Sequence, residues 1–310
     1  MSTKKIYFMA PLANVDSSIL NVSLEFGFKI KDIPIWDYCK FISELERTTP
    51  QSISQDLTRK FPGVLDCSKQ KLYFIENSFD IKKIKNPITQ EGILSSECQK
   101  FQSELIQNYL ELTIKKMRLF KEGNIFIPFC YMYSIKDNNP HNLMTLIYSS
   151  SSHISHEKYS INDGKELTKL TEFINEIKLP FNYHFLQLAF DNFELSYKIL
   201  ERQLSFLSLM MSLETLFHPS EQGELRYRIS RNVAALLGKK DIKNSKTIFT
   251  EVKELYDKRS KLVHSGNKII VKESDLLLLR YYVRESIKEI NNIGIDKDDL
   301  LELLNSRGFS

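Results

Sequence analysis

The sequence predicts an α+β N-terminal domain followed by an all-α helical domain, and three observations support this fold class. The chain has 310 residues, 42% of them hydrophobic and 26% charged, which is enough to bury two separate cores. Short runs of strand type, separated by polar turns, fill the part before Leu179-Pro180. Beyond Pro180, apolar residues recur at spacings of three and four almost throughout. We therefore expect one domain over residues 1–180 and a second over residues 181–310.

The first domain is expected to combine strands with helices. Two long segments carry helical signals: Glu97–Lys121, which has a basic end, and Lys165–Ile177, which follows an Asn-Asp-Gly turn. The runs that predict strands are Lys5–Met9, Ser23–Ile30, Leu72–Ile75, Asn124–Ile135 and Leu143–Ser149.

The second domain is expected to be helical. Its first apolar pattern extends from Leu186 to Phe217, and it predicts one very long helix or two nearly collinear ones. A second helix, over Glu224–Leu237, would stop at Gly238 as its C′ residue. The remaining helices are expected from Ser245, as N-cap, to Gly266, from Ser274 to Gly294, and in a short segment after Asp296.

Charge and cysteine usage exclude several classes of protein. The 43 Lys and Arg residues stand against 39 Asp and Glu residues, for a formal net charge of +4. This balance excludes a wholly polybasic nucleic-acid coat protein and an acidic disordered tail protein, so any nucleic-acid site must be local. The cysteines lack the close spacing of a zinc ribbon or a redox pair, so buried reduced thiols are expected at Cys39, Cys67, Cys98 and Cys130.

The N-terminal apolar run is too short for a secretory signal and is interrupted by Pro11. No segment approaches the roughly 20 apolar residues that a membrane span needs. We therefore expect a soluble cytoplasmic protein without a membrane partner.

The helix expected after Ser245 contains an anomaly at Arg259. Periodicity predicts a core residue at this position, because the apolar stripe consists of Ile248, Val252, Leu255, Leu262 and Val263. Burying an unpaired guanidinium costs free energy, so Arg259 should face a partner, a cleft or a subunit interface. A purely structural interpretation pairs Arg259 with a carboxylate such as Glu214.

His264 follows Arg259 by five residues and directly precedes Ser265-Gly266. The glycine places His264 in the last helical turn, where the negative end of the helix dipole favours a protonated imidazole. On an ideal helix the two side chains point roughly 140° apart. Fraying of the helix end, or a second copy of the chain across a two-fold axis, would bring them together.

Basic residues concentrate around this helix. The stretch from Arg226 to Lys268 contains 12 basic and 4 acidic residues, a net charge of +8. A phosphate-binding surface is one interpretation, and a solvated lysine-rich face is the other. We assign Arg226, Arg228 and Arg231 a structural role, as partners of Glu214 and Glu221.

Two further patterns carry weaker chemical signals. His153-x-x-His156 has metal-ligand spacing but lies in a serine-rich stretch with no cysteine nearby, so no metal site is expected. Helix capping explains the aspartates Asp296, Asp298 and Asp299 better than a calcium loop does, because the glycine and terminal glutamate of such a loop are missing.

Three blocks of the second half occur in an order typical of a known family. They are Leu213–Phe217, then Glu224–Ile229 leading to Ala234–Gly238, then Leu255–Gly266, which contains the Arg-x4-His motif before Ser-Gly. In these blocks the chain resembles the Apea-like branch of HEPN (higher eukaryotes and prokaryotes nucleotide-binding) domains. The resemblance covers about residues 183–305 and does not extend to the first half.

The resemblance implies an all-α HEPN-type helical bundle that commonly dimerises, with the Arg-x4–6-His motifs of two subunits lining one cleft. Many members are metal-independent ribonucleases, which implies Arg259 and His264 as the catalytic pair and no cofactor. In this reaction a ribose 2′-OH attacks the adjacent phosphate, and the product is a 2′,3′-cyclic phosphate. The resemblance implies that His264 transfers the proton and that Arg259 stabilises the negative charge that develops on the phosphate. Substrate-binding candidates beside them are Lys258, Ser260 and Lys261. Ser260 stands where many members carry Asn, Asp or His.

By the same resemblance we expect an endoribonuclease that cleaves tRNA or other RNA as a bacterial abortive-infection or anti-phage toxin. A phage-derived trigger would then act through residues 1–180, a sensor or substrate-positioning domain. The alternative is a non-catalytic HEPN module that binds RNA or nucleotide and acts as a dimerisation or sensor protein.

Overall fold

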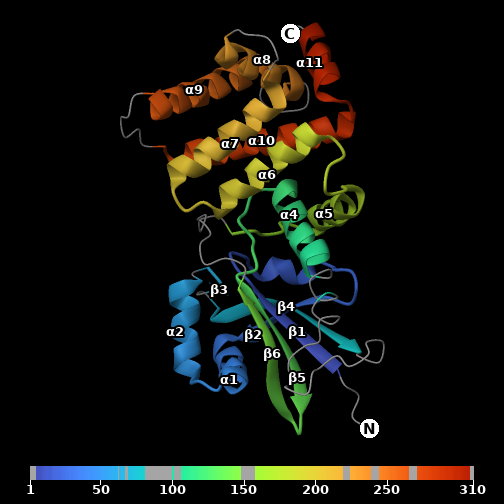
Figure 1. Cartoon of the computed structure of the whole chain (residues 1–310), viewed down its shortest axis with the longest axis vertical. Helices are drawn as coiled ribbons and strands as arrows, with labels where there is room; N and C mark the ends of the chain where they lie inside the picture. Colours follow the sequence, from blue (N-terminus) through green and yellow to red (C-terminus); the bar gives the residue numbers. More distant parts are fainter. Residues whose placement is uncertain are drawn as a thin grey trace. The chain divides into compact units, whose positions relative to one another are not determined.

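The computed structural model describes residues 5–61, 63–66, 69–80, 100, 106–147, 158–218, 224–238, 244–264 and 271–307 (Figure 1). The chain divides into two compact units, Met1–Ile177 and Lys178–Ser310. The first unit contains an antiparallel sheet with helices and the second is helical, so the coarse fold class is the one that the sequence predicts.

The sheet of the first unit is antiparallel and has β1 in its centre. Its strand order is β2 (Lys29–Pro34), β4 (Lys71–Asp80), β1 (Lys5–Leu12), β5 (Phe129–Lys136) and β6 (Asn139–Ile147), with the short β3 (Leu65–Asp66) also paired to β4. Ile6 of β1 lies opposite Phe79 on one side and Ser134 on the other. Successive β1 side chains enter two different cores, as with Phe8 and Met9, which explains why the strand is apolar almost throughout.

Helices pack on both faces of this sheet. On one face, α1 (Ile35–Glu46) and α2 (Pro50–Lys60) contribute Tyr38, Ile42 and Leu57 to a core with Tyr131. On the other face, α4 (Leu112–Phe120) and α5 (Gly164–Glu176) contribute Met117 and Leu170. A π-helical segment, η3 (Ile106–Glu111), precedes α4. The unit is therefore layered as helices, sheet and helices.

The strand expected over Ser23–Ile30 is wrong in its first part. Phe26 and Gly27 have φ angles of 53° and 79° and form a turn, so the strand begins only at Lys29. The helix expected over Glu97–Lys121 is seen as η3 and α4, and residues 101–105 lie outside the described part. A 3-10 helix, η1 (Ser17–Asn21), lies between β1 and β2.

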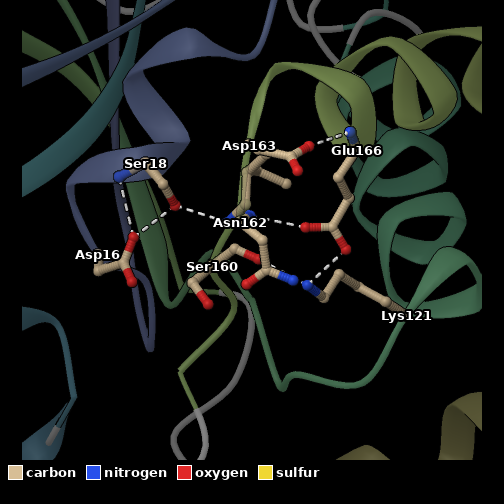
Figure 2. Close-up of polar contacts among 8 residues, drawn as sticks. Asp16, Ser18, Lys121, Ser160, Asn162, Asp163 and Glu166 are labelled. Carbon is tan, nitrogen blue, oxygen red and sulfur yellow. Dashed lines mark hydrogen bonds and ion pairs between the residues drawn. The ribbon is translucent and has the colours of Figure 1, made fainter.

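A network of polar contacts fixes the segment that leads into α5 (Figure 2). The Lys121 ammonium donates to the Ser160 carbonyl, at 2.8 Å, and lies 2.7 Å from the Glu166 carboxylate. The other oxygen of Glu166 accepts from the Asn162 backbone N–H at 2.6 Å. The Ser18 hydroxyl, at the start of η1, accepts from the preceding N–H of the segment, that of Ile161, at 2.7 Å. These contacts join η1, α4 and α5, which are distant in sequence.

The second unit begins with an antiparallel hairpin of α6 (His184–Lys198) and α7 (Arg202–Phe217) (Figure 1). Buried α7 serines donate to α6 carbonyls: Ser205 to Ser196 at 2.7 Å, and Ser212 to Ala189 at 2.6 Å. Residue numbers rise on α7 as they fall on α6, so the helices run in opposite directions. The expectation of one long helix or two collinear ones is therefore wrong. The chain turns back at residues 199–201. This stretch contains neither glycine nor proline, and the apolar spacing continues through it, so the sequence gives no signal of the turn.

The remaining helices are α8 (Leu225–Leu237), α9 (Ser245–His264), α10 (Glu273–Ile293) and α11 (Lys297–Ser306). α10 packs against α6, α7 and α8, and buries Leu279, Val283 and Ile287. Asp296 caps α11 by accepting from the Asp299 N–H at 3.0 Å, as expected for capping aspartates. No helix in the described ranges has the length and apolar content needed to cross a bilayer.

Two capping expectations near α9 need correction. The α9 cap is Asn244, whose side chain accepts from the Thr247 N–H at 2.9 Å, and Ser245 is the first helical residue. Gly238 has a φ of −64°, so it does not adopt the left-handed conformation of a C′ glycine. A Cβ there would lie 2.1 Å from the Ser245 hydroxyl and 2.7 Å from the Ala234 carbonyl oxygen. Gly238 is needed for this close approach to the start of α9.

Candidate functional site

The candidate site is built on α9, which is anchored along one side. Ile248, Val252 and Leu255 are buried, as the apolar stripe predicts, whereas Val263 in the last turn is 48% exposed. The helix remains regular through His264. Fraying up to that residue therefore does not bring Arg259 and His264 together, and Ser265 and Gly266 lie outside the described residues.

Arg259 faces Glu214 of α7. Its Nε lies 3.2 Å from Glu214 Oε1, and the two side chains are 25% and 19% exposed. Glu214 Oε1 accepts no well-aligned hydrogen bond, so the contact is an ion pair. The guanidinium also lies over the Tyr256 ring, 5.6 Å from its centre. Glu214 is the partner that the structural interpretation of the sequence named.

Tyr256 belongs to the same cluster and was not singled out from the sequence. Burial is the main cause that raises the pKa of Tyr256; the Glu214 charge adds to this effect and Arg259 opposes it. The phenol therefore stays protonated at neutral pH beside the ion pair. Its position three residues before Arg259, on the same side of a helix, is the signal that could have identified it.

His264 is exposed at the C-terminal end of α9. Within the described residues it makes no hydrogen bond or ion pair. On a regular helix its side chain points roughly 140° away from that of Arg259. A single copy of the chain therefore presents the two residues separately, and a second copy is needed to combine them in one cleft.

The three substrate-binding candidates have different surroundings. The Lys258 ammonium lies 2.6 Å from Asp275 Oδ1. The other oxygen of Asp275 accepts from the Lys272 N–H at 3.0 Å and caps α10. Lys258 thus connects α9 to the start of α10. Ser260 is partly buried and Lys261 is exposed.

Part of the basic surface is neutralised within the fold. Arg226 lies 2.6 Å from Asp257 Oδ1 on α9. Arg231 donates to the Asn305 side chain and backbone, at 3.2 and 3.0 Å. Both arginines contact other parts of the fold, but not through the expected partner Glu214: Arg226 pairs with Asp257 and Arg231 with Asn305, and Glu221 lies outside the described residues. Asp257 is already included in the count of +8 and Asn305 is neutral, so these contacts do not lower the count. The count is lowered by carboxylates from outside the stretch, Glu214 beside Arg259 and Asp275 beside Lys258.

The α6–α7 hairpin has an exposed apolar surface, which we call the hairpin face. It consists of Leu188, Leu195, Leu200, Leu204 and Met211, each 45–54% exposed. The residues of each helix lie seven apart, on the side opposite buried residues such as Phe193 and Leu209. On α7 the same stripe continues from Met211 to Glu214, one turn further. The hairpin face thus borders the Arg259–Glu214 ion pair.

The described residues contain no group of three or more His, Cys, Asp or Glu side chains arranged to hold a metal ion. Cys39 and Cys130 are buried free thiols. His153, His156, Cys67 and Cys98 lie outside the described part of the chain.

Comparison of the chain with protein-family models, curated proteins and solved structures gives no match.

Proposed function

We propose that the protein is a metal-independent endoribonuclease of the HEPN type that acts as a homodimer on tRNA or other RNA. The proposal starts from the resemblance of three sequence blocks to Apea-like HEPN domains. It includes a setting in bacterial anti-phage defence, with the first unit as the sensor or substrate-positioning part.

The observation that carries the proposal is the set of contacts that the Arg259 guanidinium makes. The closest contact of the guanidinium with Glu214 is made by Nε, at 3.2 Å, and the two terminal nitrogens donate no hydrogen bond within the described residues. Terminal guanidinium nitrogens form the fork that binds two phosphate oxygens. Glu214 can thus orient Arg259 while leaving this fork available for a phosphate.

In the proposed reaction, His264 takes the proton of a ribose 2′-OH, and the 2′ oxygen attacks the adjacent phosphorus. Arg259 stabilises the additional negative charge of the phosphorane. The bond to the 5′ oxygen then breaks, this oxygen takes a proton from water, and the products are a 2′,3′-cyclic phosphate and a 5′-hydroxyl. DNA lacks the 2′-OH and resists cleavage.

Incubation of the purified protein with total tRNA, and with a matched single-stranded DNA, in EDTA tests the proposal. We expect cleavage of RNA only, with cyclic phosphate ends. Arg259→Ala and His264→Ala should each lower the rate by about 10²–10⁴-fold. Lys253→Ala, which removes a cation elsewhere on α9, should stay within about threefold of the wild type. Absence of cleavage by folded, dimeric protein, or full activity of His264→Ala, would contradict the proposal.

The Arg259–Glu214 ion pair also favours a second candidate, a non-catalytic module that binds RNA or nucleotide. An ion pair that serves only to hold α9 on α7 needs no substrate. In that case the same assay would give RNA binding without cleavage.

A further inference from the structure

The first unit contains a cavity of ≈180 Å³ between α1, α2 and the β5–β6 part of the sheet. Ile53, Leu57, Phe61 and Phe129 provide apolar and aromatic walls. An apolar cavity of about 150 Å³ holds one benzene molecule. The space is therefore suited to a single aromatic ring with a short substituent.

Tyr38 lines the cavity and carries a hydrogen-bond donor without a partner in the described part of the chain. A ligand reaches this donor only when neighbouring side chains shift, because the hydroxyl has almost no accessible surface. Tyr38 is fully buried, and its hydroxyl has no hydrogen-bond partner among the described residues. Burial, with smaller contributions from Tyr131 and Glu46, raises the pKa of Tyr38 well above its usual value. The hydroxyl thus keeps its proton, and buried donors of this kind normally have an acceptor.

The lining also carries an uncompensated negative charge. Glu46 accepts a hydrogen bond from the Tyr131 hydroxyl at 2.6 Å and is itself exposed. The other carboxylate, Asp56, is 3.0 Å from the Lys60 ammonium, whereas no cation pairs with Glu46 within the described residues. A carboxylate next to aromatic rings favours a cationic ligand group.

We propose that this cavity is a binding site for a small arylalkylamine, in which a short alkyl chain joins a protonated amine to an aromatic ring. The ring lies between the apolar walls, an oxygen on the ring accepts the Tyr38 hydrogen bond, and the protonated amine binds Glu46. The proposal concerns the first unit alone and does not depend on the ribonuclease activity.

Three probes of similar size test these contacts one at a time. Their affinities for the full chain are measured by isothermal titration calorimetry. Tyramine has the ring, the oxygen and the amine; phenethylamine lacks the oxygen, and 4-ethylphenol lacks the amine. We expect tyramine to bind about tenfold more tightly than either of the others. Equal affinities for all three probes, or no binding of tyramine at millimolar concentration, would overturn the proposal.

Isosteric variants assign the contacts. Tyr38→Phe should lower the affinity for tyramine about tenfold and leave the affinity for phenethylamine unchanged. Glu46→Gln should lower the affinity for both amines and leave the affinity for 4-ethylphenol unchanged. Tyr133→Phe, a buried tyrosine of the same core that does not line the cavity, should have no effect. Equal losses in Tyr133→Phe and Tyr38→Phe would contradict the assigned contact.

Discussion

The Arg259 side chain combines a structural contact with the phosphate contact that we propose for it. Its Nε faces Glu214 and its guanidinium covers Tyr256, so its position is set by α7 and by its own helix. The ion pair also reduces the positive charge that a phosphate would meet. The balance between these two effects of Glu214 can be measured.

We predict that Glu214→Gln tightens the binding of a short RNA several-fold at low salt and steepens the salt dependence, because one neutralising charge is removed beside Arg259. Fluorescence anisotropy of a labelled RNA measures both quantities. Asp191→Asn, which removes one carboxylate charge on α6, is the control and should change the affinity less. If both variants tighten binding equally, the effect is one of net charge and Arg259 is not the phosphate contact.

Gly123 has a backbone conformation that only glycine adopts easily. Its φ is 141°, and a Cβ there would lie 2.8–2.9 Å from side-chain and backbone atoms of Tyr159. We predict that Gly123→Ala lowers the free energy of unfolding of the first unit by about 1–3 kcal/mol, measured by urea denaturation. Gly164→Ala, at the open start of α5, should have no destabilising effect. Equal destabilisation by both changes would show that the contact with Tyr159 is not the cause.

At the scale of elements, the serines of α7 explain how two apolar helices form a tight hairpin. Small side chains let the backbones approach, and each buried hydroxyl donates to a carbonyl of the partner helix. Apolar spacing alone predicts helices but not this pairing, because the same spacing results whether the chain continues straight or turns back.

We predict that Ser212→Leu destabilises the second unit by about 1–3 kcal/mol through overpacking, and that Ser212→Ala costs about 0.5–1.5 kcal/mol through the lost hydrogen bond. Denaturant unfolding followed by helical circular dichroism measures both. Met211→Leu, one residue away on the exposed side, should stay within about 0.5 kcal/mol of the wild type. A harmless Ser212→Leu would refute the close approach of α6 and α7 at this position.

At the scale of the whole molecule, the proposed function needs a dimer, and the hairpin face is the surface that we expect a second copy of the chain to cover. Its five residues are large, apolar and about half exposed, and exposed apolar surfaces commonly mark protein interfaces. A second copy docked there would place two Arg259–Glu214 pairs beside the same interface.

We predict that the protein is a dimer in sedimentation experiments and that Leu204→Glu with Met211→Glu produces a folded monomer, because buried unpaired carboxylates disfavour the interface. The monomer should also lose RNA cleavage. Ile135→Glu changes an exposed apolar residue of the first unit and should leave the dimer intact. A double variant that remains dimeric would exclude the hairpin face as the interface.

The sequence by itself determined the change from sheet to helices, the buried side of α9 and the need of Arg259 for a partner, whereas the structure identified that partner as Glu214. These features depend on local periodicity and on the free-energy cost of an unpaired buried charge, and both can be derived from residue types and spacing. Only the tertiary structure decided that α6 and α7 form a hairpin, that Asn244 caps α9, that Gly238 makes room for Ser245, and that a cavity lies beside Tyr38. Each of these depends on which distant segments pack together, and periodicity within one segment carries no information about that packing.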